Sequence, residues 1–277
     1  MKYPENYINK IICRNCLEAM KDIPDKSIDM VLTSPPYDSL REYGGLDWGE
    51  HIWKPIIKEL YRIMKDGGTV VWVVGDATTG GTESGTSFRQ ALYFKETGFN
   101  LHDTMIYKKN SSPYPSGKKG VRYTNIFEYM FVFSKGKPKT INLLQDKKNR
   151  YAHQSSWGKR KERRKDGELV EVEKVIVKEF GVRNNIWRYN TGAGFTTNEK
   201  IAFNHPAVFP EQLARDHIVS WSNKGDIVLD PMCGSGTTCK MAKLNNRNFI
   251  GIDISEDYCN IARKRLIKIS ERLEKFM

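Results

Sequence analysis

Five residues with useful chemistry directly follow a short apolar segment of the chain: Thr33, Ser34, Pro35, Pro36 and Tyr37. The apolar segment, residues 28–32, is continuous and rich in β-branched side chains, which predicts a buried strand. The two prolines end this strand, because neither has an N–H to donate and each fixes φ. A hydroxyl, stiffened backbone carbonyls and an aromatic face are therefore expected together at the end of a strand. This arrangement suits a flat ring that carries an exocyclic amino group.

A glycine-rich turn near the other end of the chain predicts a nucleotide site. Residues 227–229 are predicted to form a strand, and they are followed by the turn at 234–236 and by a predicted helix. Glycines let the backbone approach a ligand closely, and a helix N-terminus presents free N–H groups. About twenty residues further on, Asp253 ends another predicted strand and can accept hydrogen bonds from ribose hydroxyls. The third glycine of the dinucleotide fingerprint is missing, so an adenosine-bearing ligand without a pyrophosphate fits better than NAD.

Strand and helix patterns alternate along the chain, which predicts an α/β fold with a mostly parallel sheet covered on both faces. The predicted strands cover residues 8–13, 28–33, 68–74, 101–108, 128–134, 227–229 and 249–253. The predicted helices cover residues 16–21, 51–64, 87–96, 210–221, 239–244 and 256–276. Residues 140–185 break this alternation, and we interpret them as an accessory insertion.

The positive charge of the chain is concentrated in this insertion. The formal net charge is +12, and residues 147–165 hold nine Lys and Arg against one acid, Glu162, which leaves +8 in this stretch. Aromatic residues are interleaved with the cations, as is typical of an arm that binds nucleic-acid phosphates. A solvated, partly disordered loop is the alternative interpretation. The predicted nucleic-acid contacts are Lys147, Lys148, Arg150, Lys159, Arg160, Lys161, Arg163 and Arg164.

Length and composition restrict the remaining possibilities. With 277 residues, of which 39% are hydrophobic, the chain can bury one large core or a core with a small accessory lobe. No apolar run is long enough to cross a membrane, and the polar start lacks a signal-peptide core, so a cytoplasmic protein is expected. Cys13 and Cys16 form a C-x-x-C pair without a second pair, and we interpret them as small buried hydrophobic residues. No metal site is predicted.

The two main motifs, in this order, resemble those of the S-adenosylmethionine-dependent amino-methyltransferases of DNA, which methylate N4 of cytosine or N6 of adenine. The chain is similar to the permuted β group, in which the Pro-Pro-Tyr segment precedes the cofactor loop. Matching pieces lie at residues 29–37, 67–70, 109–113, 128–129, 185–187, 205–210 and 228–253. Either main motif alone is only suggestive, whereas both together are highly specific.

The resemblance implies a Rossmann-like, seven-stranded methyltransferase sheet whose first two strands come from the C-terminal third of the chain. Residues 1–139 would form the catalytic half of the methyltransferase domain, residues 196–277 its cofactor-binding part, and residues 140–195 a basic target-recognition insertion. The implied cofactor is S-adenosylmethionine. Its implied contacts are Asn15, Thr33, Phe209, Pro210, Asp230, Pro231, Gly234, Ser235, Gly236, Thr237 and Asp253. Asn15 stands where the family usually carries Asp, near the adenine of the cofactor.

The implied chemistry is the activation of a poor nucleophile. By accepting hydrogen bonds from both amino protons, Ser34 Oγ and the Pro35 carbonyl would draw the exocyclic nitrogen toward tetrahedral geometry and free its lone pair. Positioning then supplies much of the rate, and no strong general base is needed. Tyr37 would stack on a base flipped out of the duplex. The competing interpretation is that Pro-Pro-Tyr is only a rigid turn.

The predicted function is site-specific methylation of double-stranded DNA. In the family, Ser at the first motif position goes mostly with N4 of cytosine, and Asp or Asn mostly with N6 of adenine, so Ser34 favours N4-cytosine. N6-adenine methylation is the main alternative, followed by an RNA or protein methyltransferase and by a non-catalytic DNA-binding relic. A cognate restriction endonuclease acting separately is a candidate partner, and the protein is expected to be a monomer or a dimer.

Overall fold

The computed structural model describes residues 2–38, 48–110, 122–155, 160–172, 175–192 and 194–274. Within it the chain divides into two compact units. The first unit combines residues 1–142 with residues 185–277, and the second unit is residues 143–184. Both predicted motifs therefore belong to the first unit, and the basic stretch, residues 147–165, belongs to the second.

A single mixed sheet forms the middle of the first unit, and its described part has eight strands in the order β1-β14-β13-β2-β3-β7-β6-β12. The first five of these are parallel to one another, β7 is antiparallel to both of its neighbours, and β12 is parallel to β6. Their bounds are β1 Lys10–Cys13, β14 Asn248–Asp253, β13 Ile227–Asp230, β2 Ile28–Thr33, β3 Met64–Val74, β7 Phe127–Ser134, β6 Asn100–Lys109 and β12 Ile186–Tyr189. The predicted α/β, Rossmann-like sheet is confirmed, and β14 and β13 from the C-terminal third lie in it between β1 and β2.

The prediction of seven strands is wrong by one, because β12 adds an edge strand that sequence analysis missed. Trp187 and Tyr189 are buried in this strand, whereas Ile186 and Arg188 are exposed. This alternation is the pattern of a strand with one covered face. The strand also pairs with the outer edge of β6, whose backbone groups would otherwise be left open.

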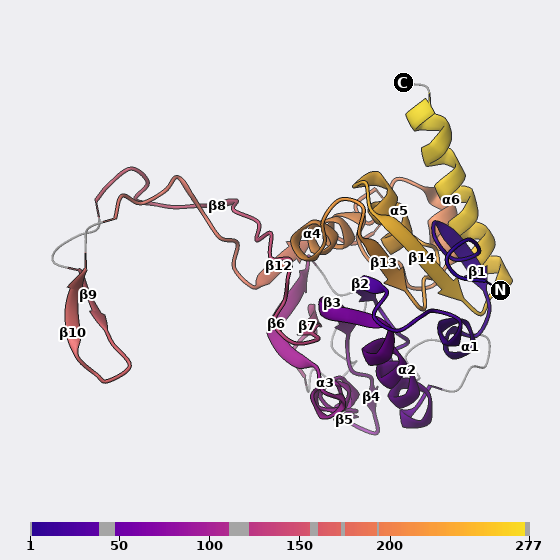
Figure 1. Ribbon diagram of the computed structural model, residues 1–277, viewed down its shortest axis with the longest axis horizontal. Coiled ribbons are helices and arrows are strands. Elements are labelled where there is room, and N and C mark those ends of the chain that lie inside the picture. Colours follow the sequence, from indigo (N-terminus) through magenta and orange to yellow (C-terminus); the bar gives the residue numbers. More distant parts are fainter. Residues whose placement is uncertain are drawn as a thin grey trace. The chain divides into compact units, whose positions relative to one another are not determined.

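Helices cover both faces of the sheet (Figure 1). Helices α1 (Cys16–Lys21), α2 (Glu50–Ile63) and α3 (Thr86–Thr97) pack in sequence against one another on one face. Helices α4 (Glu211–Trp221), α5 (Thr237–Leu244) and α6 (Glu256–Glu274) pack on the other face, together with the short 3-10 helix η1 (Lys200–Asn204). A small hairpin joins β4 (Thr78–Thr79) to β5 (Thr82–Glu83). In the part that the structure describes, no helix is long and apolar enough to cross a membrane.

The central strands β2 and β3 account for the continuous apolar runs in the sequence. Met30, Val31 and Leu32 are fully buried, as expected for a strand with helices on both of its faces. Strand β3 already begins at Met64, where the sequence predicted Gly68 as its start. Gly68 lies inside the strand. A Cβ at this position would be only 2.8 Å from the carbonyl oxygen of Asp29. The glycine therefore permits the close approach of β2.

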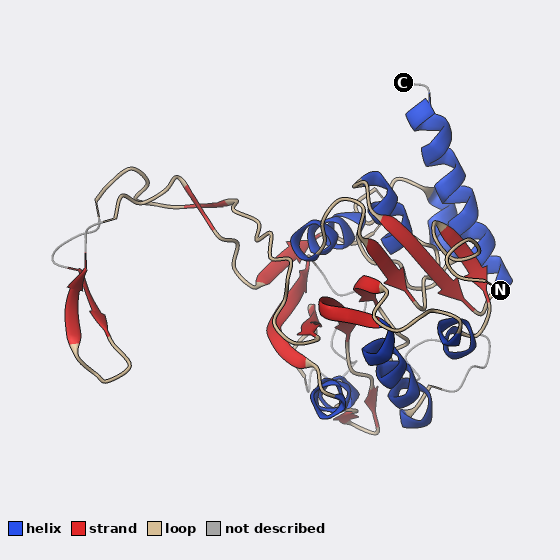
Figure 2. Cartoon of the chain, viewed as in Figure 1, coloured by secondary structure: helices blue, strands red, loops and turns tan. Residues whose placement is uncertain are grey.

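The second unit consists of short antiparallel pairs, with no helix in its described residues (Figure 2). Strand β8 (Lys147–Lys148) pairs with β11 (Phe180–Gly181), and β9 (Arg160–Arg163) pairs with β10 (Leu169–Val172). Arg183 donates hydrogen bonds to Asp146 near the start of this unit. The basic stretch therefore contributes one strand to each of these two antiparallel pairs.

Candidate active site

A buried hydrogen bond joins the two main motifs at the carboxyl ends of β2 and β13. Thr33 Oγ1 donates to Asp230 Oδ1 at 2.8 Å, although the two residues are 197 positions apart in the chain. The backbone N–H of Met232 donates to the same oxygen at 3.2 Å. Asp230 is 1% exposed, and this burial raises its pKa to about 7, although hydrogen bonds from Thr33 and Thr238 oppose the shift. The carboxyl group of Asp230 thus ties the start of the glycine turn to the Pro-Pro-Tyr strand.

The larger of two adjoining cavities, here called the glycine-loop cavity, has a volume of about 430 Å³. Seven of the predicted cofactor residues line it: Asn15, Phe209, Pro231, Gly234, Ser235, Thr237 and Asp253. The other four predicted cofactor residues do not line this cavity. Thr33 and Asp230 are buried in their mutual hydrogen bond, Pro210 caps the start of α4, and Gly236 packs against α6. The volume is within the range of about 300–1,000 Å³ that is usual for small-molecule sites.

Gly234 and Asp253 shape the floor of the glycine-loop cavity. The backbone N–H of Gly234 donates to Asp253 Oδ2 at 2.8 Å, and that of Ser255 donates to Oδ1 at 2.9 Å. Burial raises the pKa of Asp253, and these backbone hydrogen bonds partly oppose it. Gly234 has a φ of +46°, and a Cβ there would lie 2.5 Å from Nε2 of His205. Only glycine fits this turn, which keeps the backbone open to a ligand.

Asn15 has a second task beside this cavity. Its side-chain oxygen accepts hydrogen bonds from the backbone N–H groups of Leu17 and Glu18, and it thereby caps α1. Because the cap uses only the oxygen, the amide NH₂ remains as the donor that Asn15 can offer to a ligand.

Two buried polar atoms of the glycine-loop cavity suit the implied cofactor. Asp38 and Trp48 line the cavity, and Asp38 Oδ2 and Trp48 Nε1 are buried without a hydrogen-bond partner among the described residues. A carboxylate oxygen can accept from the ammonium or amino group of S-adenosylmethionine, and an indole N–H can donate to its carboxylate or adenine. The residues present therefore fit the cofactor. Sequence analysis missed Asp38, although its place directly after Tyr37 was a signal.

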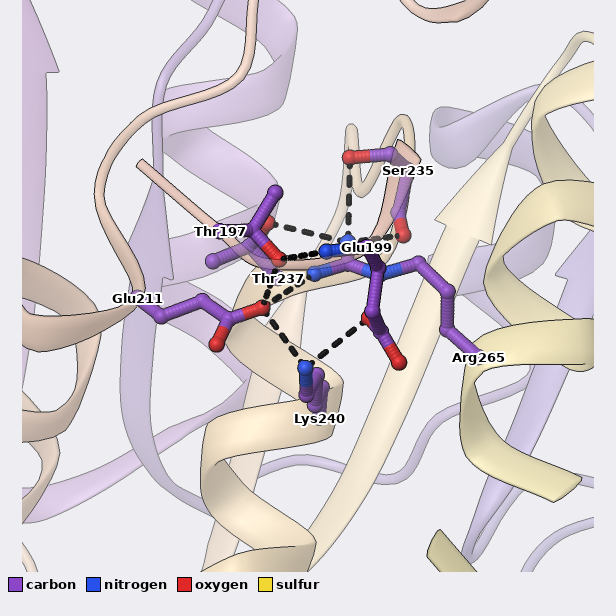
Figure 3. Close-up of polar contacts among 7 residues, drawn as sticks. All are labelled: Thr197, Glu199, Glu211, Ser235, Thr237, Lys240 and Arg265. Atoms are coloured by element: carbon purple, nitrogen blue, oxygen red, sulfur yellow. Dashed lines mark hydrogen bonds and ion pairs between the residues drawn. The ribbon is translucent and has the colours of Figure 1, made fainter. Parts of the chain in front are cut away.

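A buried cluster of charges supports the glycine turn from below, and Figure 3 shows its members. Arg265 of α6 is 0% exposed and donates to the backbone oxygen of Ser235 at 2.6 Å. It also donates to Glu199 and Glu211, each at 2.7 Å, and Lys240 donates to the same two carboxylates. Two buried cations thus neutralise two half-buried carboxylates.

The carboxyl group of Glu199 is held ionised in this cluster. Burial raises its pKa, but hydrogen bonds from Lys240 and Arg265 outweigh burial, and the net result is a lowered pKa. Sequence analysis missed the cluster because its members come from four separate segments. In each segment the charged residues have the pattern expected of an exposed surface.

The smaller cavity, here called the Tyr37 cavity, has a volume of about 320 Å³ and adjoins the first. Ser34 lines both cavities, whereas Pro35 and Tyr37 line only the Tyr37 cavity and Pro36 only the glycine-loop cavity. Groups bound in the two cavities would therefore meet at Ser34. His205 and Phe209 also line both.

The hydroxyl of Ser34 is oriented by a chain of polar contacts. Ser34 Oγ lies 2.9 Å from the hydroxyl oxygen of Tyr37, which lies 3.0 Å from Glu128 Oε2. Glu128 Oε1 is paired with Lys109 Nζ at 2.5 Å. An ionised carboxylate only accepts, so Tyr37 donates to Glu128 and Ser34 donates to Tyr37. In the contacts that the structure describes, this leaves the lone pairs of Ser34 Oγ for a donor N–H in the cavity.

The predicted nucleic-acid contacts lie in the second unit. Lys147 and Lys148 form β8 and are exposed, and Arg150 follows them in an exposed turn. Lys161 and Arg163 are exposed on β9, and Arg164 follows with an ion pair to Glu168 at 3.8 Å. The backbone of Arg160 belongs to β9, and Lys159 lies outside the described residues.

Comparison with known proteins identifies relatives along nearly the whole chain. Residues 28–264 match the family model described as DNA methylase. The orphan methyltransferase M.BamHII of Bacillus amyloliquefaciens is 57% identical over 258 residues, which are 92% of this chain and 95% of that protein. Similarity at this level over nearly the full length of both chains reflects common descent.

Two solved structures share the fold. The PvuII DNA methyltransferase (cytosine-N4-specific) has a TM-score of 0.67 at 21% identity and covers 94% of this chain and 89% of its own. The complex of M1.HpyAVI with SAM has a TM-score of 0.59 at 23% identity and covers 93% of this chain and 98% of its own.

Proposed function

Because the chain belongs to the DNA methylase family, the S-adenosylmethionine-dependent amino-methyltransferases of DNA, we propose that it methylates N4 of cytosine in double-stranded DNA. The observation that carries the choice of base is Ser34, which lines both cavities. In the family, Ser at this position accompanies mostly N4 of cytosine, whereas enzymes for N6 of adenine mostly carry Asp or Asn. The presence of Ser at position 34 is therefore what favours N4 of cytosine in the proposal.

The chain's own groups prepare the amino nitrogen for attack. Ser34 Oγ and the Pro35 carbonyl accept hydrogen bonds from the two N–H groups of the amino nitrogen. The nitrogen lone pair therefore leaves its conjugation with the ring and points toward the glycine-loop cavity. When bound there, the cofactor supplies an electrophilic methyl group on a sulfonium sulfur. Transfer would join the methyl group to the amino nitrogen while the electron pair of the C–S bond stays on sulfur, and the proton that the nitrogen gives up would pass to water. Tyr37, held by Glu128, fixes the ring plane of the flipped base.

The exposed cations of the second unit bind the phosphate backbone of the target duplex. Lys147, Lys148, Lys161 and Arg163 lie on short strands, and their side chains are exposed. Contacts of this kind position a protein on DNA and make its affinity depend on salt. A cognate restriction endonuclease would act separately on the same sequence.

Transfer of a labelled methyl group tests the proposal. The protein is incubated with labelled S-adenosylmethionine and, in parallel, with genomic DNA, total RNA or a protein mixture. We expect label in DNA alone. Label in RNA or protein but not in DNA would refute a DNA substrate, and binding of cofactor and DNA without transfer would show a relic that has lost catalysis.

A further inference from the structure

Tyr107 of β6 carries a buried hydroxyl that has no hydrogen-bond partner in the described parts of the chain. The residue is 2% exposed and lines the Tyr37 cavity beside Lys109 and Glu128. Nearly all buried hydroxyls in native proteins are hydrogen-bonded, because leaving one unpaired destabilises the fold. Tyr107 belongs neither to the Pro-Pro-Tyr segment nor to the residues that line the glycine-loop cavity.

The surroundings of Tyr107 fix its ring and keep its proton. Tyr107 faces Glu128 across the β6–β7 pairing, and Lys109 Nζ lies 6.0 Å from the centre of its ring. The ring of Tyr189 packs against it with the two centres 6.0 Å apart. Burial, and then the negative charge of Glu128, raise the pKa of Tyr107 well above its ordinary value. The hydroxyl therefore stays protonated and can donate.

Glu128 does not serve as the missing partner. One of its oxygens accepts from Tyr37 and the other is paired with Lys109. Of the two tyrosines that line the Tyr37 cavity, Tyr37 thus has a hydroxyl engaged with protein groups, whereas the hydroxyl of Tyr107 is buried and has no partner among the described residues. A ligand in the cavity supplies the natural acceptor.

We propose that Tyr107 donates a hydrogen bond to the ring nitrogen next to the amino group of the flipped base, which is N3 in cytosine. This inference rests on the proposed function. Ser34 and Pro35 would hold the amino group in the same cavity, and the adjacent ring nitrogen is an acceptor in cytosine. Thymine presents an N3–H donor and a carbonyl at these two places, so the two O–H and N–H donors would oppose each other. Tyr107 is a residue that determines base specificity.

The test combines one substitution with one altered base. Tyr107→Phe removes the hydroxyl, and 3-deazacytosine, in which C–H replaces N3, removes the acceptor. In a duplex that carries the mapped target cytosine, we expect Tyr107→Phe to lower the single-turnover rate or the affinity for the base about tenfold, as for loss of one hydrogen bond. With 3-deazacytosine the wild-type enzyme should fall to the level of the variant, and the variant should fall no further. The assignment would be overturned if 3-deazacytosine lowered the rate or affinity of both enzymes by the same factor. It would also be overturned if Tyr107→Phe acted on cytosine like the wild-type enzyme.

A stability measurement separates this role from a structural one. Tyr107→Phe removes a hydroxyl that lacks a protein partner, so the ligand-free variant should unfold at the same or a higher temperature, and it should bind S-adenosylmethionine normally. Tyr189→Phe is the matched control, because the neighbouring Tyr189 hydroxyl donates to Asp216 at 2.8 Å. That variant should lose stability and keep the wild-type response to 3-deazacytosine. A destabilised Tyr107→Phe with a normal analogue response would contradict the proposal.

The identity of the methylated base is determined separately on the wild-type enzyme. A product of N6-methyladenine would refute N4-cytosine as the function and leave Tyr107 to be tested with 1-deazaadenine, which lacks the equivalent ring acceptor. The failure of one proposal can therefore be distinguished from the failure of the other.

Discussion

The hydroxyl of Thr33 and the carboxyl group of Asp230, 2.8 Å apart and fully buried, hold the end of β2 against the end of β13. This contact brings the Pro-Pro-Tyr segment and the glycine turn to the same edge of the sheet. In parallel strands all carboxyl ends meet at one edge, which is where α/β proteins bind their ligands. This hydrogen bond and the pairing of β2 with β13 together fix the relative position of the two cavities.

The pKa of Asp230 predicts how stability depends on pH. It is raised by burial from 3.8 to about 7, so the folded protein binds more protons than the unfolded chain in that interval. The free energy of unfolding should therefore fall as pH rises from 3.8 to about 7, by an amount on the order of a few kcal/mol. Asp230→Asn keeps an acceptor for Thr33 but does not titrate. Urea unfolding at a series of pH values should show a flatter profile for this variant, and identical slopes would contradict the prediction.

Removal of the Ser34 hydroxyl should separate catalysis from cofactor binding. Ser34→Ala deletes the acceptor for one amino proton, and we expect methyl transfer to slow by about 100- to 1,000-fold, as when one aligned polar group is lost from an active site. The affinity for S-adenosylmethionine should stay at the wild-type value. Single-turnover rates and calorimetric titration measure the two effects. An unchanged rate would show that Ser34 does not hold the amino group.

Arg265 should be needed for stability and for the shape of the cofactor cavity. Arg265→Met leaves Glu199 and Glu211 with only Lys240, and we expect a loss of about 3–5 kcal/mol in the free energy of unfolding. The affinity for S-adenosylmethionine should fall as well, because Arg265 holds the backbone oxygen of Ser235. Denaturant unfolding and calorimetric titration test both effects.

Arg263 provides the control on the same helix. Its ion pair with Glu256 at 2.6 Å is partly exposed, so Arg263→Met should cost no more than about 1 kcal/mol and should leave the cofactor affinity unchanged. Equal effects of the two substitutions would mean that the buried cluster has no special role.

The second unit should contribute electrostatically to DNA binding. The double variant Lys161→Gln, Arg163→Gln removes two cations from β9, and each lost phosphate contact should lower the slope of log affinity against log salt by about 0.9. Lys58→Gln with Lys95→Gln removes two exposed cations from α2 and α3 and is the matched control. Binding titrations at several salt concentrations measure the slopes. Equal slopes in the two variants would show that only overall charge matters.

Local sequence patterns were sufficient to predict the two motifs and most of the sheet. The apolar run before Ser34 and the glycine turn at 234–236 each carry their own turn chemistry, and their order along the chain identified the family. Helix α1 could also be located, because Asn15 and Glu18 stand at the spacing of a helix cap. These features depend on neighbours within a few residues, which a single sequence displays.

The missed features depend on contacts between distant segments. Arg265, Glu199 and Glu211 form a cluster only when α6, α4 and the segment before α4 are packed together. In the sequence, Tyr107 is one aromatic residue in a predicted strand. Only the fold shows that it lies opposite β7 and that its hydroxyl is buried without a partner among the described residues. Strand β12 is short and follows the insertion, so its pairing with β6 had no local signal.

The base that receives the methyl group is the most direct test of the proposed function. Genomic DNA lacking prior methylation is incubated with the protein and S-adenosylmethionine that carries a deuterated methyl group, then digested to nucleosides and analysed by mass spectrometry. Serine at position 34, rather than Asp or Asn, predicts deuterated N4-methylcytosine as the product. Deuterated N6-methyladenine without N4-methylcytosine would contradict it.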